Sequence, residues 1–91
     1  MRVSRAPLPA DAPARARVAY VVPRSVGTAV VRNRVRRRLR AMIASLGPAE
    51  GLEPALYLVG AAPGVVELCT IDLRRHLVEA LHGAARRADR G

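Results

Sequence analysis

Six arginines stand among the nine residues from Arg32 to Arg40, in the order Arg-Asn-Arg-Val-Arg-Arg-Arg-Leu-Arg. Each guanidinium is a planar fork of five N–H donors that fits phosphate oxygens and can stack on unpaired bases. If the segment is helical, the arginines are held at a fixed pitch that can follow a folded RNA backbone. The chemistry that this spacing predicts is the binding of a nucleic-acid backbone.

A basic helix can also be an ordinary solvated face, and a GC-rich coding sequence favours arginine over lysine. Ordinary solvated faces usually include Glu for intrahelical ion pairs, and no acidic residue stands between Arg32 and Arg40. This pattern favours nucleic-acid binding. Asn33, between two arginines, either adds directional hydrogen bonds to the RNA or braces its arginine neighbours.

Residues that could support protein-based catalysis or metal binding are few and widely spaced. Cys69 is the only cysteine, and His76 and His82 stand six residues apart. We therefore expect no disulfide, zinc site or other metal site within the chain. Asp72 and Glu79 are expected to be solvated charges on a helix. Since no Ser/His/Asp or paired-carboxylate set is suggested, the sequence predicts no catalytic residue.

The charge of the chain is large and uneven. The 91 residues include 16 basic and 7 acidic side chains, for a formal net charge of +9, and every basic residue is Arg. Eleven of the arginines but only Asp11 among the acids lie in residues 1–40. Such a block indicates a polyanionic partner, with nucleic acid ahead of an anionic membrane surface. A chain of this length forms one thin core and has no room for a deep, dry active site.

The expected location is the cytoplasm. No apolar run approaches the roughly 18–20 residues of a membrane span, and the N-terminus lacks the apolar core of a secretory signal. A single cysteine also fits a reducing compartment.

The elements that must position the arginines follow from the hydrophobic spacing. Residues 17–22 alternate as a strand, and because both of its faces are apolar we expect it to be central in its sheet. Thr28 is expected to cap a helix from Ala29 to about Leu46, which Gly47 and Pro48 end. The apolar stripe of this helix faces the core and consists of Val31, Val35, Leu39, Met42, Ile43 and Leu46.

The other side of the same helix carries the polar residues. At about 100° per residue the arc opposite the stripe holds Asn33, Arg34, Arg36, Arg37 and Arg40. Arg38 lies on the flank, and Arg32 lies nearer the apolar edge.

Residues 55–61 read as a second strand, and residues 65–69 are ambiguous. From Thr70, expected as an N-cap, a helix of mixed charge runs to about Ala88. A sheet of two strands would be marginal, so a further strand is expected near residues 2–8. Tyr20 and Tyr57, the only aromatic residues, each stand in a strand, which favours core packing over base stacking.

The predicted organisation has three parts. Residues 1–16 form a Pro/Ala/Arg-rich tail or an edge-strand remnant, residues 17–88 form a single RNA-binding α/β domain, and residues 89–91 form a short tail.

The segment from Pro23 to Arg37, PRSVGTAVVRNRVRR, resembles the signature of the protein subunit of bacterial ribonuclease P. That signature is a strand end with basic residues, followed by G-x-A-V-x-R-N-R-x-(K/R)-R on a helix. The resemblance covers about residues 17–85 and implies an α+β fold of the split β-α-β kind, like the second domain of ribosomal protein S5. In that fold a small sheet packs with an Arg-rich helix and a C-terminal helix. Its crossover is left-handed, whereas the general rule for parallel strands predicts a right-handed one.

The resemblance also implies a function. Family members bind a large catalytic RNA and precursor tRNA, and the holoenzyme is an endoribonuclease that hydrolyses a phosphodiester bond to remove the 5′ leader. The chemistry is expected from Mg²⁺ bound mainly by the RNA, while the protein grips the leader in a cleft between sheet and helices. No membrane or protein partner is implied. The residues that match RNA-facing positions of the motif are Arg24, Arg32, Asn33, Arg34, Arg36, Arg37 and Arg40.

The sequence departs from the family pattern in its first part. Members begin with a helix that carries a pair of Phe residues and continue into a fuller first strand, whereas this sequence contains no Phe. We therefore expect the first helix and part of the first strand to be absent. Ser25 stands where the family often has a second basic residue. Gly27 is expected to allow a tight turn before the helix.

Two other functions remain alternatives at this point. A non-catalytic RNA-binding module, such as a ribosomal or RNA-assembly factor, would share the charge pattern, but the R-N-R signature with its upstream G-x-A-V favours ribonuclease P. An amphipathic membrane-binding helix is disfavoured because the apolar stripe is needed for the core.

Overall fold

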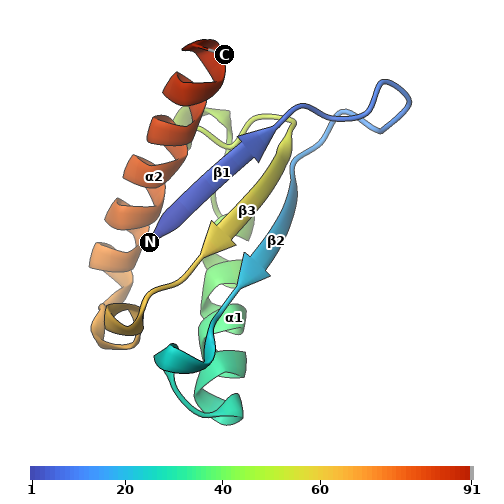
Figure 1. Cartoon of the computed structure of the whole chain (residues 1–91). Helices are drawn as coiled ribbons and strands as arrows, with labels where there is room; N and C mark the ends of the chain where they lie inside the picture. Colours follow the sequence, from blue (N-terminus) through green and yellow to red (C-terminus); the bar gives the residue numbers. More distant parts are fainter. Residues whose placement is uncertain (91) are drawn as a thin grey trace.

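The computed structural model describes the backbone of residues 1–90 and the side chains of residues 1–88. Three strands and two helices form the domain, joined in part by short 3₁₀ turns (Figure 1). The strands are β1 (Arg2–Ala6), β2 (Arg17–Val21) and β3 (Leu56–Gly60), and the helices are α1 (Ala29–Ala44) and α2 (Thr70–Arg90). The 3₁₀ turns are η1 (Arg24–Val26), η2 (Pro48–Glu50) and η3 (Pro63–Glu67).

The sheet has the order β1-β3-β2, with β1 antiparallel and β2 parallel to β3. The third strand expected near residues 2–8 is therefore confirmed as β1. The central position expected for residues 17–22 is wrong, because β3 is the central strand and β2 lies at an edge. The second face of β2 is apolar yet open, and Val21 on that face is 48% exposed.

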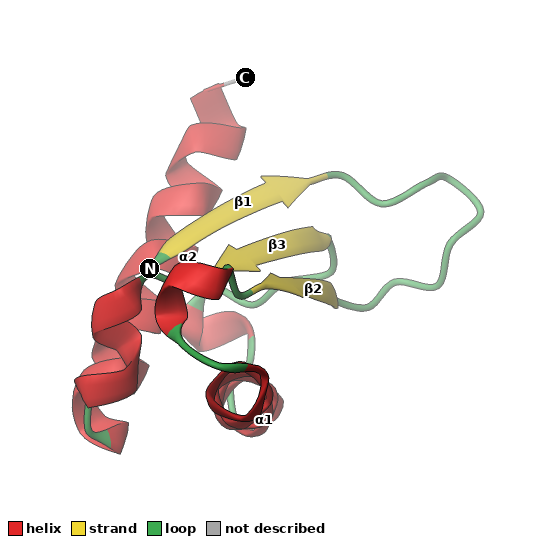
Figure 2. Ribbon diagram, turned by 60° about the horizontal axis from the view of Figure 1, so that its bottom comes forward, coloured by secondary structure: helices red, strands yellow, loops and turns green. Residues whose placement is uncertain are grey.

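The connection from β2 through α1 to β3 is a left-handed crossover. In Figure 1 both strands point down the page, β3 lies to the left of β2, and α1 lies behind the sheet. Figure 2 agrees, since α1 lies below the sheet when the molecule is turned. When the page is turned by half a circle so that both strands point up, β3 lies to the right of β2 and α1 is still behind the sheet. A right-handed connection would place the helix in front, so this one is left-handed. This is the arrangement that the family resemblance implied and that the general rule for such connections opposes.

One continuous core fills the space between the sheet and the two helices. The predicted apolar stripe of α1 faces it, with Val31 at the margin and the other five members buried. Tyr57 is 4% exposed and belongs to the core, as expected. The largest fully buried side chains are Val3, Leu39, Val59, Leu73, Leu77 and Leu81. Within the described residues, neither helix is both long enough and apolar enough to cross a bilayer.

The ends of the helices differ from expectation by a few residues. Thr28 caps α1 as predicted, because its Oγ1 accepts a hydrogen bond from the Val31 amide at 3.3 Å. The helix ends at Ala44, before Gly47, which leads into η2. Thr70 is the first residue of α2 and not its cap. Since α2 runs to Arg90, only Gly91 of the tail expected at residues 89–91 is left, and Gly91 lies outside the described residues.

Candidate nucleic-acid interface

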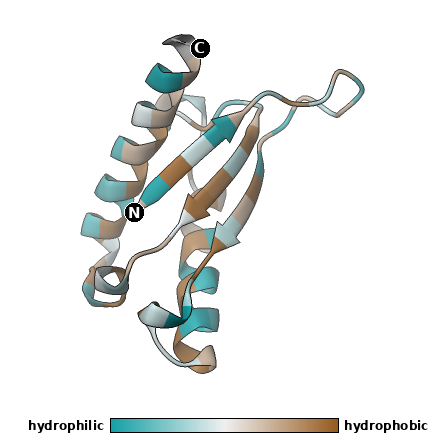
Figure 3. Cartoon of the chain, in the orientation of Figure 1, coloured by the Kyte–Doolittle hydropathy of each residue, from teal (hydrophilic) through white to brown (hydrophobic). Residues whose placement is uncertain are grey.

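Helix α1 presents its arginines in several environments because its buried stripe fixes which way each residue points. Arg34, Arg37 and Arg40 are exposed, as is Asn33, whereas Arg32, Arg36 and Arg38 are half-buried. The hydropathy colours of Figure 3 accordingly alternate around α1 between hydrophilic and hydrophobic. We call the side of α1 that carries Arg32, Asn33, Arg34, Arg36, Arg37 and Arg40 the basic face.

Within residues 1–88, no acidic side chain forms an ion pair with the basic face. Helix α1 contains no acidic residue. The ion pairs found within residues 1–88 join Arg5 to Glu53, Arg74 to Glu50 and Arg75 to Asp72, and all of these arginines lie outside α1. No ion pair within residues 1–88 involves an arginine of α1, so the basic face remains available to an external anion.

Arg24 adds a further charge at the start of α1. It is exposed and lies in η1, which packs against α1. Gly27 connects the two with φ 155°, a backbone conformation that disfavours a side chain. A Cβ at Gly27 would also lie 2.9 Å from Cγ1 of Val31. The tight turn predicted at Gly27 is confirmed, and it joins the turn that carries Arg24 to the start of α1.

Asn33 has a definite partner in the structure. Its Oδ1 accepts a hydrogen bond from Nη1 of Arg36 at 3.1 Å. Of the two roles that the sequence left open, bracing an arginine is therefore the one seen, and the arginine is Arg36, three residues on. This contact reduces the freedom of a guanidinium that would otherwise have to be ordered on binding RNA.

Arg40 rests on an aromatic ring of the sheet edge. Its guanidinium carbon lies 5.8 Å from the centre of the Tyr20 ring, within the range of a cation–π contact. Tyr20 packs against the core but is only partly buried, so the expectation of core packing is met in part. Burial raises the pKa of the Tyr20 hydroxyl above its ordinary value, and the positive charge of Arg40 opposes that rise.

Arg32 lies at the border between the basic face and the core, as its place near the apolar edge predicted. Its Nε is covered by protein and has no hydrogen-bond partner within the part of the chain that the structure describes. A covered N–H without an acceptor costs free energy. The free protein therefore bears a cost at this residue.

Arg38 stands apart from the other arginines of α1. Its Nη2 donates to the carbonyl oxygen of Leu68 at 2.7 Å, and its Nη1 lies 3.5 Å from the carbonyl oxygen of Val65. The sequence placed Arg38 on the flank of the helix and gave no sign of these contacts, because both partners are some thirty residues further along the chain.

A shallow hollow lies on the open face of the sheet, across from the helices. Its lining is mostly apolar and includes Ser4, Ala6, Arg17, Ala19, Leu56 and Leu58. Leu58 at its centre is 45% exposed. This surface and the basic face are separate, since α1 covers the other side of the sheet.

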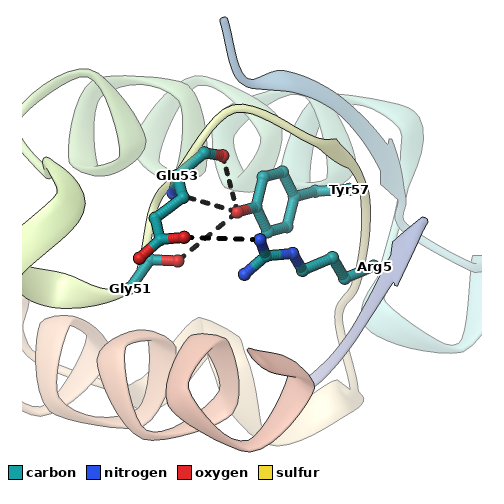
Figure 4. Close-up of polar contacts among 4 residues, drawn as sticks. All are labelled: Arg5, Gly51, Glu53 and Tyr57. Carbon is teal, nitrogen blue, oxygen red and sulfur yellow. Dashed lines mark hydrogen bonds and ion pairs between the residues drawn. The ribbon is translucent and has the colours of Figure 1, made fainter. Parts of the chain in front are cut away.

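Tyr57 holds the loop before β3 in place rather than serving a site (Figure 4). Its hydroxyl donates to the carbonyl oxygen of Glu53 at 2.7 Å, and the carbonyl oxygen of Gly51, at 3.4 Å, is a second acceptor within reach. The same hydroxyl accepts a hydrogen bond from the Glu53 amide at 3.0 Å. Arg5 lies 5.8 Å from the ring centre and pairs with the Glu53 carboxylate at 3.5 Å. These contacts link β1, β3 and the preceding loop.

The metal-binding residue types are scattered over the part of the chain that the structure describes. Among residues 1–88, three or more His, Cys, Asp or Glu side chains never gather closely enough to hold an ion. Cys69 and His76 are exposed and His82 is half-buried.

Comparison with known proteins adds independent observations. A sequence profile of the Ribonuclease P family matches residues 4–85. The ribonuclease P protein component of Micrococcus luteus is 47% identical over 70 residues, which cover 74% of this chain and 52% of the relative. That of Mycobacterium sp. (strain KMS) is 40% identical over 80 residues, which cover 87% of this chain and 66% of the relative. This chain thus spans about half the length of the Micrococcus protein.

The solved structure of a Staphylococcus aureus RNase P protein superimposes with a TM-score of 0.71 over 90% of this chain and 72% of that chain. The two sequences are 20% identical, so the superposition shows a shared fold.

Proposed function

Because the chain belongs to the ribonuclease P protein family, we propose that it acts as the protein component of a holoenzyme that removes the 5′ leader from precursor tRNA in the cytoplasm. In this proposal the chain binds the catalytic RNA through the basic face of α1. Precursor tRNA is the substrate of the assembled particle.

The observation that carries the proposal is the unneutralised basic face. Its guanidinium groups project from one helix, and no ion pair within residues 1–88 involves an arginine of that helix. A phosphate backbone supplies the missing negative charge, and the planar forks can each engage two of its oxygens. Arg24 extends this surface beyond the first turn of the helix.

Catalysis is assigned to the RNA partner. The donor groups of the described residues do not fit a metal site, so the proposal places Mg²⁺ on the RNA, where it would activate the nucleophile for phosphodiester hydrolysis. The chain's own residues bind and orient RNA. For the single-stranded leader we propose the hollow on the open face of the sheet, whose apolar lining can contact bases while Arg17 contacts phosphate.

The test is reconstitution of the chain with the ribonuclease P RNA of the same organism and a precursor tRNA at low Mg²⁺. The wild-type chain is expected to restore cleavage. Replacing Arg34 and Arg37 together by Ala should weaken RNA binding. The fall of log K with log salt should also become shallower, by about 0.7–0.9 per lost phosphate contact. The matched control replaces Arg74 and Arg75 of α2 by Ala and so removes the same charge. These two arginines form ion pairs with Glu50 and Asp72.

Equal losses in the two double variants would show that net charge and not the basic face binds RNA. RNA binding by the wild-type chain without any restored cleavage would instead indicate a non-catalytic RNA-binding module.

A further inference from the structure

Arg38 uses its guanidinium inside the protein, unlike its neighbours on α1. It is half-buried, and the contact from Nη2 to the Leu68 carbonyl is short, at 2.7 Å. The carbonyl of Val65, 3.5 Å from Nη1, is the second acceptor. A hydrogen bond from a charged donor is stronger than one between neutral groups. Two of the five donors of Arg38 are therefore directed at the backbone of η3 and the residue that follows it.

The Leu68 carbonyl depends on this contact. Leu68 has an extended backbone, with ψ 132°, and α2 begins two residues later. The first bond of the helical ladder joins the Leu73 amide to the carbonyl of Cys69, so the Leu68 carbonyl lies outside it. Loss of Arg38 would leave this partly buried acceptor to find another donor.

The segment that Arg38 holds also supports Arg24. Turn η3 packs against both α1 and η1. Val65 of η3 and Val26 of η1 are both buried in the core, 5% and 8% exposed. Arg24 lies two residues before Val26. A continuous path of contacts thus runs from Arg38 through η3 to the turn that carries Arg24.

We infer that Arg38 is a positioning residue that fixes the turn carrying Arg24 relative to the basic face of α1, and that it does not bind phosphate itself. The inference rests on the proposed function, because it concerns how the two parts of one RNA-binding surface are aligned. Of the six arginines of α1, five then face RNA, and Arg38 instead holds the turn that carries Arg24.

A double-mutant cycle tests the inference. Arg38→Met keeps the apolar stem and removes the donors, and Arg37→Met makes the same change on an exposed arginine. RNA affinity is measured over a range of salt concentrations for each variant with and without Arg24→Ala. With Arg24 already replaced by Ala, Arg38→Met should leave the dependence of log K on log salt unchanged, whereas Arg37→Met should make it shallower by about 0.7–0.9.

The coupling is the second readout. The loss of affinity caused by Arg24→Ala should shrink by about two- to tenfold when Arg38 is Met, because Arg24 is then no longer held in place. The loss should be the same when Arg37 is Met. In Arg38→Lys, which keeps one charged donor, the loss of affinity on Arg24→Ala should be larger than in Arg38→Met. If Arg38 only stabilised the fold, its replacement would not change the effect of Arg24→Ala in particular.

Two results would overturn the inference: in the Arg24→Ala background, a salt slope that becomes as much shallower for Arg38→Met as for Arg37→Met, or a loss of affinity on Arg24→Ala that is the same with Arg38 as with Met at that position. Should Arg38→Met fail to fold, Arg38→Gln, which removes the charge but keeps an amide donor, still decides between an unchanged and a shallower slope in the Arg24→Ala background. Failure of the proposed function is distinguishable, because the wild-type chain would then bind no RNA. Hydrogen exchange would still show whether residues 63–69 open selectively in Arg38→Lys compared with Arg37→Lys.

Discussion

The arginines of α1 are one residue type in the sequence and several kinds of group in the structure. Arg34 and Arg37 face solvent, Arg36 is held by Asn33, and Arg40 lies over Tyr20. Fixing the rotamer of a free arginine on binding costs up to about 2 kcal/mol of side-chain entropy. An arginine already held by a contact within the protein has less of this entropy to lose. The braced residues are therefore already partly ordered for an incoming phosphate backbone.

Arg32 is expected to lower the stability of the free protein while strengthening its binding to RNA. Its covered Nε–H lacks an acceptor, and Arg32→Met removes this group while keeping an apolar stem of similar length. The free variant should gain about 1 kcal/mol of unfolding free energy, or about 4–8 °C in Tm, and should bind RNA more weakly. Thermal unfolding by circular dichroism and RNA titrations measure the two effects.

Arg34→Met provides the control for this prediction. Arg34 is exposed, so its substitution should weaken RNA binding with little gain in Tm. A Tm for Arg32→Met no higher than that of Arg34→Met would show that the covered N–H carries no cost.

At the scale of elements, the junction between η1 and α1 is the most sensitive point. Gly27→Ala would place a Cβ 2.9 Å from Val31 and force a side chain onto a backbone with φ 155°. We expect a loss of about 1–3 kcal/mol in unfolding free energy and weaker RNA binding, because the turn moves Arg24 and the start of α1. Chemical denaturation with hydrogen exchange over residues 24–32 measures this loss.

Gly64→Ala is the matched control, since nothing lies within 4 Å of a Cβ at that position. It should leave stability and RNA binding almost unchanged. Equal stability of the two variants would mean that the junction tolerates a side chain.

Local patterns in the sequence predicted the elements well. The stripe of α1 and its Thr28 cap depend on residues three and four apart, which a helix brings together whatever surrounds it. The predicted central position of β2 was wrong because alternation reports how apolar each face is and not how many neighbouring strands there are. Val21 and Leu58 lie on a face of the sheet that is open in this chain.

Features that depend on distant contacts could not be predicted from the spacing of residues. The left-handed crossover was implied only by the family resemblance. The partners of Arg38 follow it by 27 and 30 residues, and the place of Arg40 over Tyr20 required the packing of α1 on the edge strand. The candidate site was thus predicted as a set of residues, and the structure supplied the role of each.

For the whole molecule, the uneven charge opposes folding and favours RNA binding. A net charge of +9 on one small domain repels itself when no anion is bound. Raising NaCl from about 10 to 150 mM shortens the Debye length from about 30 to 8 Å. The Tm of the free protein should therefore rise over this range, while RNA affinity falls. Calorimetry and filter binding in the same buffers measure the two trends.

The variant with Arg34 and Arg37 both replaced by Gln should show a smaller rise of Tm with salt, because it starts with less self-repulsion. A Tm that falls on addition of salt would mean that the ion pairs of Arg5, Arg74 and Arg75 outweigh the repulsion along α1.

The placement of the two tyrosines gives the protein a built-in pair of optical probes. The chain contains no Trp and no Phe, so its near-ultraviolet absorption and intrinsic emission come from Tyr20 and Tyr57. Tyr57 is enclosed in the core, whereas the ring of Tyr20 lies beneath Arg40 of the basic face. Tyr57 emission therefore follows unfolding, and Tyr20 emission follows events at the surface of α1. With Tyr57→Phe, Tyr20 beside the basic face remains the one tyrosine, and because Phe does not absorb in the tyrosine band, occupancy of that surface can be followed without any attached dye.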